Sequence, residues 1–413
     1  MFGWARFFHA HLPRYQPAQE VSAPVNTRIE DPDIPEQLLM VPGPTPVPAE
    51  VRAYGARPLI NHRSQAFREL YGRIRPALQR VFQTEHDVVV YPASGTGALE
   101  AAIVNCFSPG DRILSLSMGA FGERWAEIAQ AFGLDVDILS VPYGESIDPV
   151  AVRHKLQGQR FTGVLTTFNE TSTGVLLDLE NVARAVHEHS DALLLVDAVS
   201  GLGGADLRMD EWACDVVVTG SQKALMAPPG LAMVAFSPRA WEASQKTRLP
   251  RSYFDWRPYR TQAAHLETPY TPAVSLWYEL DASLRRLLAE GLAAVFARHK
   301  AMAHIARTAF SAAGLPVLAR ESNASPTVTA ALLPEGRSFA DLSEGLAARG
   351  VTVGGGLGPL RGKMVRIGHM GGLRTSELVR FFHALDEVLV ALGWNAAHQA
   401  GPAAASAATE GLR

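Results

Sequence analysis

Seven short, largely apolar runs, several of them followed by segments with helical spacing, constrain the fold of this chain more than any other feature. A run that is apolar along most of its length predicts a strand that is buried on both faces. Such strands alternating with helices are typical of a mostly parallel sheet that helices cover on both sides. We therefore predict an α/β fold. The runs are 88–91, 112–116, 135–141, 164–168, 192–196, 215–219 and 231–236, and helical spacing is found at 98–105, 121–132 and 179–189.

The second half of the chain shows a different pattern. A long helical region over 276–313 contains Gly291, and strand-like and helix-like segments follow it in turn. This alternation predicts a smaller α+β domain after the first sheet. Its strands are predicted over 327–333 and 364–367, and its helices over 339–349 and 375–392.

Both ends of the chain lack the apolar periodicity of the middle. The first 37 residues are rich in proline, which argues against regular structure, and they do not resemble a secretory leader. The tail is rich in alanine and poor in bulky residues, so we expect it to stay flexible and not to pack. We therefore predict an extended arm, a large domain, a small domain and a tail, over residues 1–37, 38–290, 291–395 and 396–413.

Composition excludes several classes of function. The 38 Lys and Arg residues against 41 Asp and Glu give a formal net charge of −3, without the basic footprint of a nucleic-acid-binding protein. The two cysteines, Cys106 and Cys214, cannot form a disulfide framework or a four-thiolate zinc site, so we expect a reducing, cytoplasmic location. No apolar run is long enough to predict a membrane-spanning helix. We predict no metal site, because His187 and His189 point to different faces of a predicted helix.

A turn rich in glycine and hydroxyl groups follows the first predicted strand. Ser94, Gly95 and Thr96 lie between that strand and the helix predicted from residue 98. Free N–H groups and hydroxyls at a helix N-terminus can bind an anion, which makes this turn a candidate phosphate site. An ordinary strand–turn–helix connection explains the same residues about equally well. The turn is neither a dinucleotide fingerprint nor a Walker loop.

Two charged residues follow later strands at the same predicted edge of the sheet. Asp197 comes directly after the run 192–196, and Lys223 follows the run 215–219. Each alone is explained by a helix cap or a surface position. Together with the turn at Ser94, however, they match what pyridoxal phosphate requires of a protein. An amine can form a Schiff base with its aldehyde, a carboxylate can hold its pyridinium proton, and a helix N-terminus can hold its phosphate.

The motifs around these residues resemble those of the class V aminotransferases, which have the pyridoxal-phosphate-dependent transferase fold type I. The resemblance is closest to the alanine/serine–glyoxylate aminotransferase branch. It implies a large domain with a mostly parallel seven-stranded sheet and a smaller C-terminal α+β domain. The matching stretches, in order, are PGPTPVP (42–48), NHRS (61–64), ASGTGALEAAI (93–103), NETSTG (169–174), LLLVDAVSGLGG (193–204), VTGSQKALMAPPG (218–230), TPYTPA (268–273) and GKMVRIGHMG (362–371).

The resemblance implies a role for each matching residue. Lys223 would form the Schiff base and move the proton at the substrate α carbon, and Asp197 would pair with the pyridine nitrogen. Arg366 would bind the substrate α-carboxylate through two parallel hydrogen bonds. The phosphate would be bound by Ser94, Gly95, Thr96 and Gln222, the phenolic oxygen by Thr171, the two ring faces by Phe121 and Val199, and the substrate side by the backbone at Gly43.

Two further residues imply a homodimer with shared active sites. Thr268 and Thr271 would reach the phosphate of the neighbouring subunit. The sequence departs from many relatives at Phe121, where tryptophan is common, and from some at Thr268, where tyrosine occurs. His62 and Arg63 would lie near the entrance of the site.

We expect a dimeric transaminase that works by a ping-pong mechanism. A small amino acid (serine, alanine or aspartate) would donate nitrogen, and a small 2-oxo acid (glyoxylate or pyruvate) would accept it. Alternatives within the fold are a pyridoxamine–pyruvate type of aminotransferase and a specialised biosynthetic enzyme. A cofactor-binding protein without catalysis is the alternative outside enzymes, and the presence of Lys223, Asp197 and Arg366 argues against it. Cysteine desulfuration is disfavoured, because it needs a reactive cysteine on a mobile loop in the second half of the chain, and neither cysteine fits that position.

Overall fold

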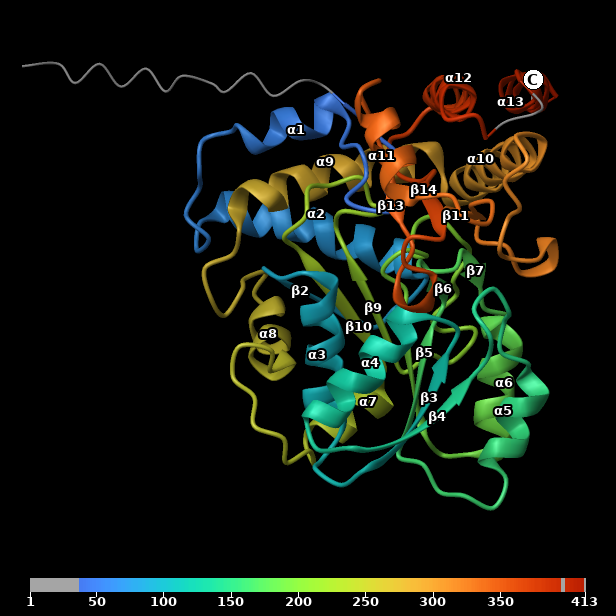
Figure 1. Cartoon of the computed structure of the whole chain (residues 1–413). Coiled ribbons are helices and arrows are strands. Elements are labelled where there is room, and N and C mark those ends of the chain that lie inside the picture. The colour runs from blue at the N-terminus through green and yellow to red at the C-terminus, as the bar shows by residue number, and fades with distance from the viewer. Residues whose placement is uncertain (1–36, 395–397, 412–413) are drawn as a thin grey trace, which may run out of the picture. The chain divides into compact units, whose positions relative to one another are not determined.

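A seven-stranded sheet lies at the centre of the fold in this computed structural model, which describes residues 37–394 and 398–411 (Figure 1). All neighbouring strands pair in parallel except β10, which is antiparallel to both its neighbours. The prediction of an α/β fold with a mostly parallel seven-stranded sheet is therefore confirmed. The strand order is β2 (Asp87–Tyr91), β10 (Ala232–Phe236), β9 (Val216–Gly220), β8 (Leu193–Asp197), β5 (Gly163–Thr167), β3 (Arg112–Ser117) and β4 (Asp135–Ser140).

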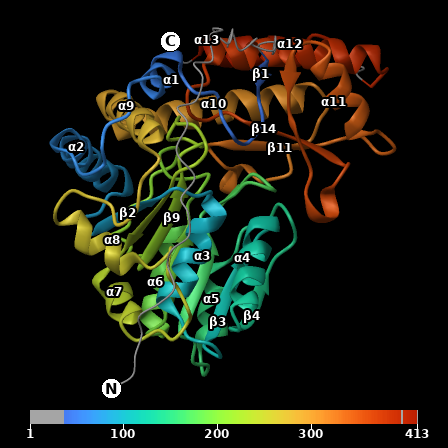
Figure 2. The ribbon, with the colours of Figure 1, turned by 90° about the vertical axis from the view of Figure 1, so that its left-hand side faces the viewer.

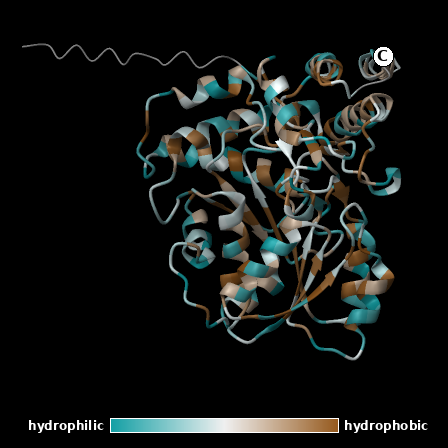
Figure 3. Cartoon of the chain, viewed as in Figure 1, coloured by the Kyte–Doolittle hydropathy of each residue, from teal (hydrophilic) through white to brown (hydrophobic). Residues whose placement is uncertain are grey.

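The two faces of this sheet contribute to two separate hydrophobic cores. Successive side chains of a strand point to opposite faces, so Leu194 and Val196 of β8 join one core while Leu193 and Leu195 join the other. Figure 3 shows the central strands as largely hydrophobic along their length. Helices α2 (Gln65–Phe82), α5 (Pro149–Leu156), α6 (Leu179–His189) and α9 (Val274–Glu290) contribute to the first core. Helices α3 (Gly95–Cys106), α4 (Ala120–Ala131), α7 (Pro238–Ser244) and α8 (Trp256–Ala263) contribute to the second.

A third core surrounds a three-stranded sheet in the second half of the chain, which is seen at the top of Figure 2. The strands are β11 (Val328–Leu332), β14 (Met364–Gly368) and β13 (Gly354–Gly355), and the helices are α10 (Leu292–Ala312), α11 (Phe339–Ala347) and α12 (Thr375–Ala391). The long predicted helical region ends and restarts at Gly291, whose φ of +86° breaks α9 from α10.

The segment at the start of the described residues joins this third core. Strand β1 (Leu38–Leu39) pairs in parallel with β12 (Val351–Thr352), and Met40 is fully buried there. The predicted domain boundaries place residue 38 in the large domain, whereas the packing joins it to the core of the C-terminal part. The remaining short elements are α1 (Ala49–Gly55), β6 (Asn169–Glu170), β7 (Val175–Leu176) and two 3₁₀ turns at Glu321–Asn323 and Gly358–Leu360.

The two predicted terminal segments have different outcomes. The predicted N-terminal arm lies outside the described residues, apart from Gln37. The expectation that the tail does not pack is wrong for α13 (Ala400–Glu410), which packs against α10 and α12. Alanine favours helix, and small residues let the helices approach closely: a Cβ placed on Gly401 would lie 3.2 Å from the Cβ of Ala313. Within the described ranges, no helix is long and apolar enough to cross a membrane.

Candidate active site

Three segments that bear predicted site residues meet at the carboxyl edge of the central sheet. Strand β8 ends in Asp197, β9 ends three residues before Lys223, and β2 ends three residues before Ser94. Asp197 lies directly opposite Val218 of β9 in the parallel register. Ligands in open α/β sheets bind outside the carboxyl ends of the strands, so the topology places this edge as the candidate site.

The side chain of Lys223 is partly buried, and its amine packs tightly against the backbone of the PGPT segment. Its Nζ donates a hydrogen bond of 2.5 Å to the carbonyl of Pro42. A Cβ added to Gly43, whose φ is +144°, would lie 2.2 Å from the same Nζ, so only glycine fits there. Burial and, to a smaller extent, the charge of Arg366 lower the Lys223 pKa to about 8, against the opposing charge of Asp197. A lowered pKa makes the neutral, nucleophilic amine accessible near neutral pH.

The carboxylate of Asp197 is buried without a cation in contact. Asp197 is 3% exposed and accepts a 2.9 Å hydrogen bond from the N–H of Val199. Within residues 37–394 and 398–411 it has no ion-pair partner. Burial raises the Asp197 pKa to about 7, and the N–H of Val199 opposes that shift. A buried carboxylate of this kind would be stabilised by a ligand that brings a positive charge, as a protonated pyridine does.

The first turn of α3 has the donors that a phosphate group needs. Ser94 is the N-cap residue, but its hydroxyl does not bond to the helix, and the N–H groups of Gly95 and Thr96 lack intrahelical partners because they lie in the first turn. A Cβ on Gly95 would lie 2.8 Å from Val199 Cγ2, so Val199 packs directly beneath this turn. The Oε1 atom of Gln222 is buried without a hydrogen bond. The N–H groups and the hydroxyl of this turn fit the phosphate of pyridoxal phosphate, whereas Gln222 could bind a phosphate only through its NH₂ group.

A buried guanidinium lies on the side of the site that the third core contributes. Arg366 of β14 is 7% exposed and donates to two carbonyls, from Nε to Gly355 (2.7 Å) and from Nη1 to Thr171 (2.9 Å). It has no carboxylate in contact among the residues that the structure describes. Burial lowers the Arg366 pKa to about 10, while the charge of Glu170 opposes that shift. Such a cation suits a substrate carboxylate. The Thr171 hydroxyl donates to Ser200 at 2.7 Å.

Phe121 lies in the first turn of α4 and is half-buried. The guanidinium of Arg124 lies 4.9 Å from the ring centroid of Phe121, and the backbone N–H of Phe121 donates to the carboxylate of Glu170.

Glu170 is a residue that the sequence interpretation missed, although it belongs to the NETSTG stretch. Its signal in the sequence is a charged residue two positions after the short run 164–168, where burial requires several donors.

The two threonines of the TPYTP stretch form a separate group in this chain. Thr268 is buried and its hydroxyl donates to the carbonyl of Tyr270 at 2.8 Å, while Thr271 is exposed. The Arg63 guanidinium donates to the carbonyl of Thr268 at 2.6 Å, which connects the NHRS stretch to this loop. No contact between either threonine and Lys223 or Asp197 is found in the described part of the chain.

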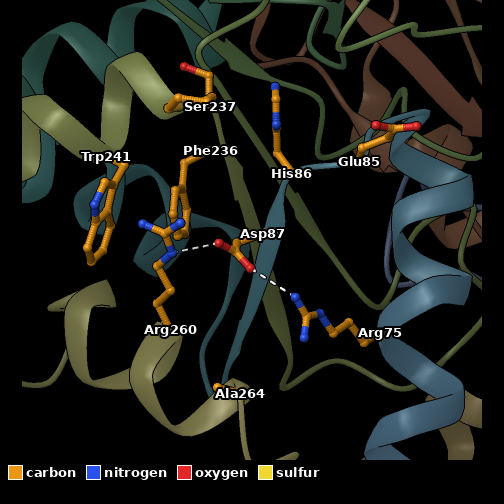
Figure 4. Close-up of a pocket in the computed structure, with 10 residues that line it drawn as sticks. Arg75, Glu85, His86, Asp87, Phe236, Ser237, Trp241, Arg260 and Ala264 are labelled. Atoms are coloured by element: carbon orange, nitrogen blue, oxygen red, sulfur yellow. Dashed lines mark hydrogen bonds and ion pairs between the residues drawn. The ribbon is translucent and has the colours of Figure 1, made fainter.

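A pocket of about 450 Å³ lies at the opposite end of the sheet (Figure 4). It includes Asp87, the first residue of β2, whose carboxylate pairs with two arginines that also line the pocket. Asp87 accepts from Arg260 Nε at 2.7 Å and from Arg75 Nη2 at 3.2 Å, and Arg260 stacks 4.1 Å from the ring centroid of Trp241. None of the predicted site residues lines it.

Comparisons with known proteins agree with the geometry of the carboxyl edge. The family model described as Aminotransferase class-V matches residues 49–386. The L-aspartate–glyoxylate aminotransferase of Paracoccus denitrificans is 42% identical over 86% of this chain and 91% of its own length. A protein named soluble hydrogenase, small subunit, from Synechococcus sp. is 41% identical over 89% of this chain and 97% of its own length.

A solved structure shares both the fold and sequence similarity. The pyridoxamine–pyruvate aminotransferase of Mesorhizobium loti superposes with a TM-score of 0.88 at 31% identity, covering 93% of this chain and 99% of that chain. Family, fold and the donor set at the carboxyl edge lead to the same assignment. The chain is a member of the class V aminotransferases, in the glyoxylate aminotransferase branch, and is a pyridoxal-phosphate-dependent transaminase.

Proposed function

We propose that this enzyme moves the amino group of a small amino acid (serine, alanine or aspartate) to glyoxylate or pyruvate in two half-reactions at one site. The observation that carries the proposal is the set of charges without ion-pair partners at the carboxyl edge, where Asp197 and Arg366 are buried and Lys223 is partly buried. The similarity to an L-aspartate–glyoxylate aminotransferase supports the choice of acceptor and of a small donor.

Each residue of the carboxyl edge would bind a different part of the cofactor. Ser94, Gly95 and Thr96 would hold the phosphate, with Gln222 assisting, and Thr171 would hold the phenolic oxygen. Asp197 would keep a proton on the pyridine nitrogen, and Phe121 and Val199 would enclose the ring. Lys223 Nζ would attach covalently at the aldehyde carbon. When bound, pyridoxal phosphate supplies an electron-accepting ring that stabilises negative charge at the substrate α carbon.

Two side chains of the site, Arg366 and Lys223, act on the substrate itself. Arg366 binds and orients the α-carboxylate, because the carbonyls of Gly355 and Thr171 hold its planar guanidinium in one direction. The Lys223 amine would move a proton from the α carbon to the former aldehyde carbon of the cofactor, and it would move a proton in the reverse direction in the second half-reaction. Its lowered pKa suits this acid–base role near neutral pH. The backbone at Gly43 lines the space beside the amine.

The proposal includes a cytoplasmic homodimer in which each subunit completes the other's site. In the loop of the TPYTP stretch, Thr271 is exposed and so is accessible to a neighbouring subunit, whereas the hydroxyl of Thr268 is buried and donates to the carbonyl of Tyr270 in its own chain. Tyr253 and Tyr270 stack with ring centroids 5.5 Å apart and are 41% and 40% exposed beside this loop. Exposed aromatic side chains of this kind are enriched in protein interfaces. Sedimentation velocity of the purified protein tests the dimer.

An absorbance spectrum followed through a panel of amino donors tests the proposed reaction. A band near ~420 nm that shifts toward ~330 nm with serine, alanine or aspartate reports transfer of nitrogen to the cofactor. Addition of glyoxylate or pyruvate should then restore the first band. A band that none of these amino acids changes would contradict the proposed donors.

A second candidate is transamination of free pyridoxamine with pyruvate. The solved structure from Mesorhizobium loti, with its TM-score of 0.88, favours it. The hydroxyls of Ser94 and Thr96 at the N-terminus of α3 argue for a phosphorylated cofactor instead. Mass spectrometry of the group released from the purified enzyme distinguishes the two. Pyridoxal phosphate supports the main proposal, and a protein purified without phosphorylated cofactor that turns over pyridoxamine supports the second.

A further inference from the structure

Glu170 is a fully buried carboxylate in β6 that is surrounded by hydrogen-bond donors. Its Oε1 accepts from the N–H of Ser172 at 2.9 Å and from the hydroxyl of Ser172 at 2.6 Å. Its Oε2 accepts from the N–H of Phe121 at 3.2 Å and from the N–H of Gly122 at 3.1 Å. No cation is in contact with it in the part of the chain that the structure describes, so these donors and the N-terminus of α4 stabilise the charge.

These hydrogen bonds connect two segments that reach the cofactor site from different sides. One is the first turn of α4, which carries the Phe121 ring. The other is the segment after Glu170, in which the Thr171 carbonyl orients Arg366. The segments approach so closely that a Cβ on Gly119 would lie 2.3 Å from the hydroxyl of Ser172. The Ser172 hydroxyl also accepts from the N–H of Ala120 at 3.0 Å.

We propose that Glu170 is a positioning residue of the cofactor site. Its carboxylate holds α4 against the segment 170–172, and so fixes the Phe121 ring over the cofactor and Arg366 toward the substrate carboxylate. Glu170 itself does not touch the reacting atoms. The inference rests on the proposed function, because the roles of Phe121 and Arg366 belong to it.

A carboxylate is required here rather than any polar side chain of the same size. Both oxygens face donors only, and an ionised carboxylate is acceptor-only at both positions. A glutamine would turn its NH₂ group toward either Ser172 or the N–H groups of α4, whichever way the amide is oriented. One side of the junction would therefore lose its acceptor and gain a donor–donor repulsion.

The test compares E170Q with D215N, a matched change at the other end of the sheet. Asp215 is also buried and accepts from three donors: the N–H of Leu194 (3.0 Å), the hydroxyl of Ser237 (2.7 Å) and the guanidinium of Arg239 (3.0 Å). Four quantities are measured: the dissociation constant of pyridoxal phosphate from apoprotein by tryptophan fluorescence, the KM and the kcat for the donor, and the urea midpoint.

E170Q should weaken cofactor binding about tenfold, which corresponds to the loss of one well-made buried hydrogen bond. It should also raise the donor KM more than it lowers kcat, because Arg366 loses its orientation. D215N should lower the urea midpoint about as much as E170Q does, while it leaves the cofactor constant within about twofold, since its donors lie far from the site. S172A removes the hydroxyl that donates to Glu170 and accepts from the N–H of Ala120, and it keeps the other donors to Glu170. This variant should weaken cofactor binding about threefold, and it replaces E170Q in the test if E170Q does not fold.

Three results separate this inference from the proposed function. Equal cofactor dissociation constants for E170Q, D215N and wild type would overturn the role of Glu170 and leave the proposed function intact. That role would also be overturned if E170Q did not fold and S172A bound the cofactor as wild type does. A wild-type protein that binds no pyridoxal phosphate would overturn both the role of Glu170 and the proposed function.

Discussion

The two ends of the central sheet differ in whether their charged side chains form ion pairs within the protein. At the amino end, Asp87 lies between Arg75 and Arg260, and Asp215 accepts from Arg239. At the carboxyl end, by contrast, Asp197, Lys223 and Arg366 have no ion-pair partner in contact within the described ranges, although Asp197 and Arg366 are buried and Lys223 is partly buried. The pKa values of all three are shifted in the direction that disfavours their charged forms.

This difference indicates that the carboxyl end of the sheet, and not the amino end, binds a charged ligand. Burying a charge without a partner costs folding free energy, so a chain keeps such charges where something else supplies the partner. The pocket of Figure 4 is lined by Arg75 and Arg260, but both arginines already pair with Asp87. Among the residues that the structure describes, no anion contacts Arg366 and no cation contacts Asp197, and under the proposed function a substrate carboxylate and a pyridinium would supply them.

Removing the amine should have the largest effect. K223A should lower turnover by at least about 10²- to 10⁴-fold, because both the covalent attachment of the cofactor and the proton transfer depend on this group. The band near ~420 nm should disappear from the purified variant. K246A, which removes an exposed lysine near the amino end of the sheet, is the control and should keep both the band and the turnover. Full turnover in K223A would remove the basis of the whole assignment.

Replacing the unpaired guanidinium should have the next largest effect. R366A should raise the donor KM by about 10- to 150-fold, the equivalent of losing a charged hydrogen-bond pair worth ~1.5–3 kcal/mol. R366K should restore little of this, since an ammonium cannot make two parallel hydrogen bonds to a carboxylate.

The matched variant for Arg366 is R260A at the amino end. It should leave the donor KM unchanged, because Arg260 binds Asp87 and not the substrate. Steady-state kinetics with saturating acceptor measure all three variants. An equal rise of KM in R260A and R366A would contradict the claim that only the carboxyl end of the sheet binds the substrate.

Neutralising one aspartate at each end should change stability in opposite directions. The folded-state pKa of Asp197 is raised to about 7, so the folded apoprotein binds this proton more tightly than the unfolded chain does. The stability of the apoprotein is therefore fully retained below about pH 4, where both states are protonated, and it falls as the pH rises through 7. At pH 8, apo D197N should therefore be more stable than apo wild type, by up to ~4 kcal/mol. D87N removes a paired carboxylate and should destabilise the protein by ~1 kcal/mol.

Urea unfolding of the apoproteins at pH 5 and pH 8 measures both effects. The advantage of D197N over wild type should shrink at the lower pH, where the wild-type carboxyl group is itself protonated. An apo D197N that is less stable than wild type at pH 8 would show that Asp197 has a partner in the apoprotein that the structure does not contain.

The sequence predicted the arrangement of the strands better than the arrangement of the contacts between them. The runs 192–196 and 215–219 predicted β8 and β9, and the rule that ligands bind at carboxyl ends pointed to Asp197 and Lys223 from periodicity alone. The position of Arg366 came from the family motif, because nothing in the local pattern shows that β14 reaches the edge of another sheet.

Two features depended on tertiary approach and could not be seen in the sequence. Glu170 is surrounded by donors because α4 begins beside the segment 170–172, and that proximity is set by packing about 50 residues apart in the chain. The helix over 400–410 was missed because alanine-rich composition was interpreted as low complexity. Burial of Ala405 against the third core provides the stabilisation that composition alone does not reveal.

A crystal structure of the enzyme grown with pyridoxal phosphate tests the central claim most directly. We predict electron density continuous with Lys223 Nζ, the pyridine nitrogen within hydrogen-bonding distance of Asp197, and the phosphate at the first turn of α3. A cofactor bound elsewhere, for example between Arg75 and Arg260 at the amino end of the sheet, would contradict the claim that unpaired buried charge marks the active site.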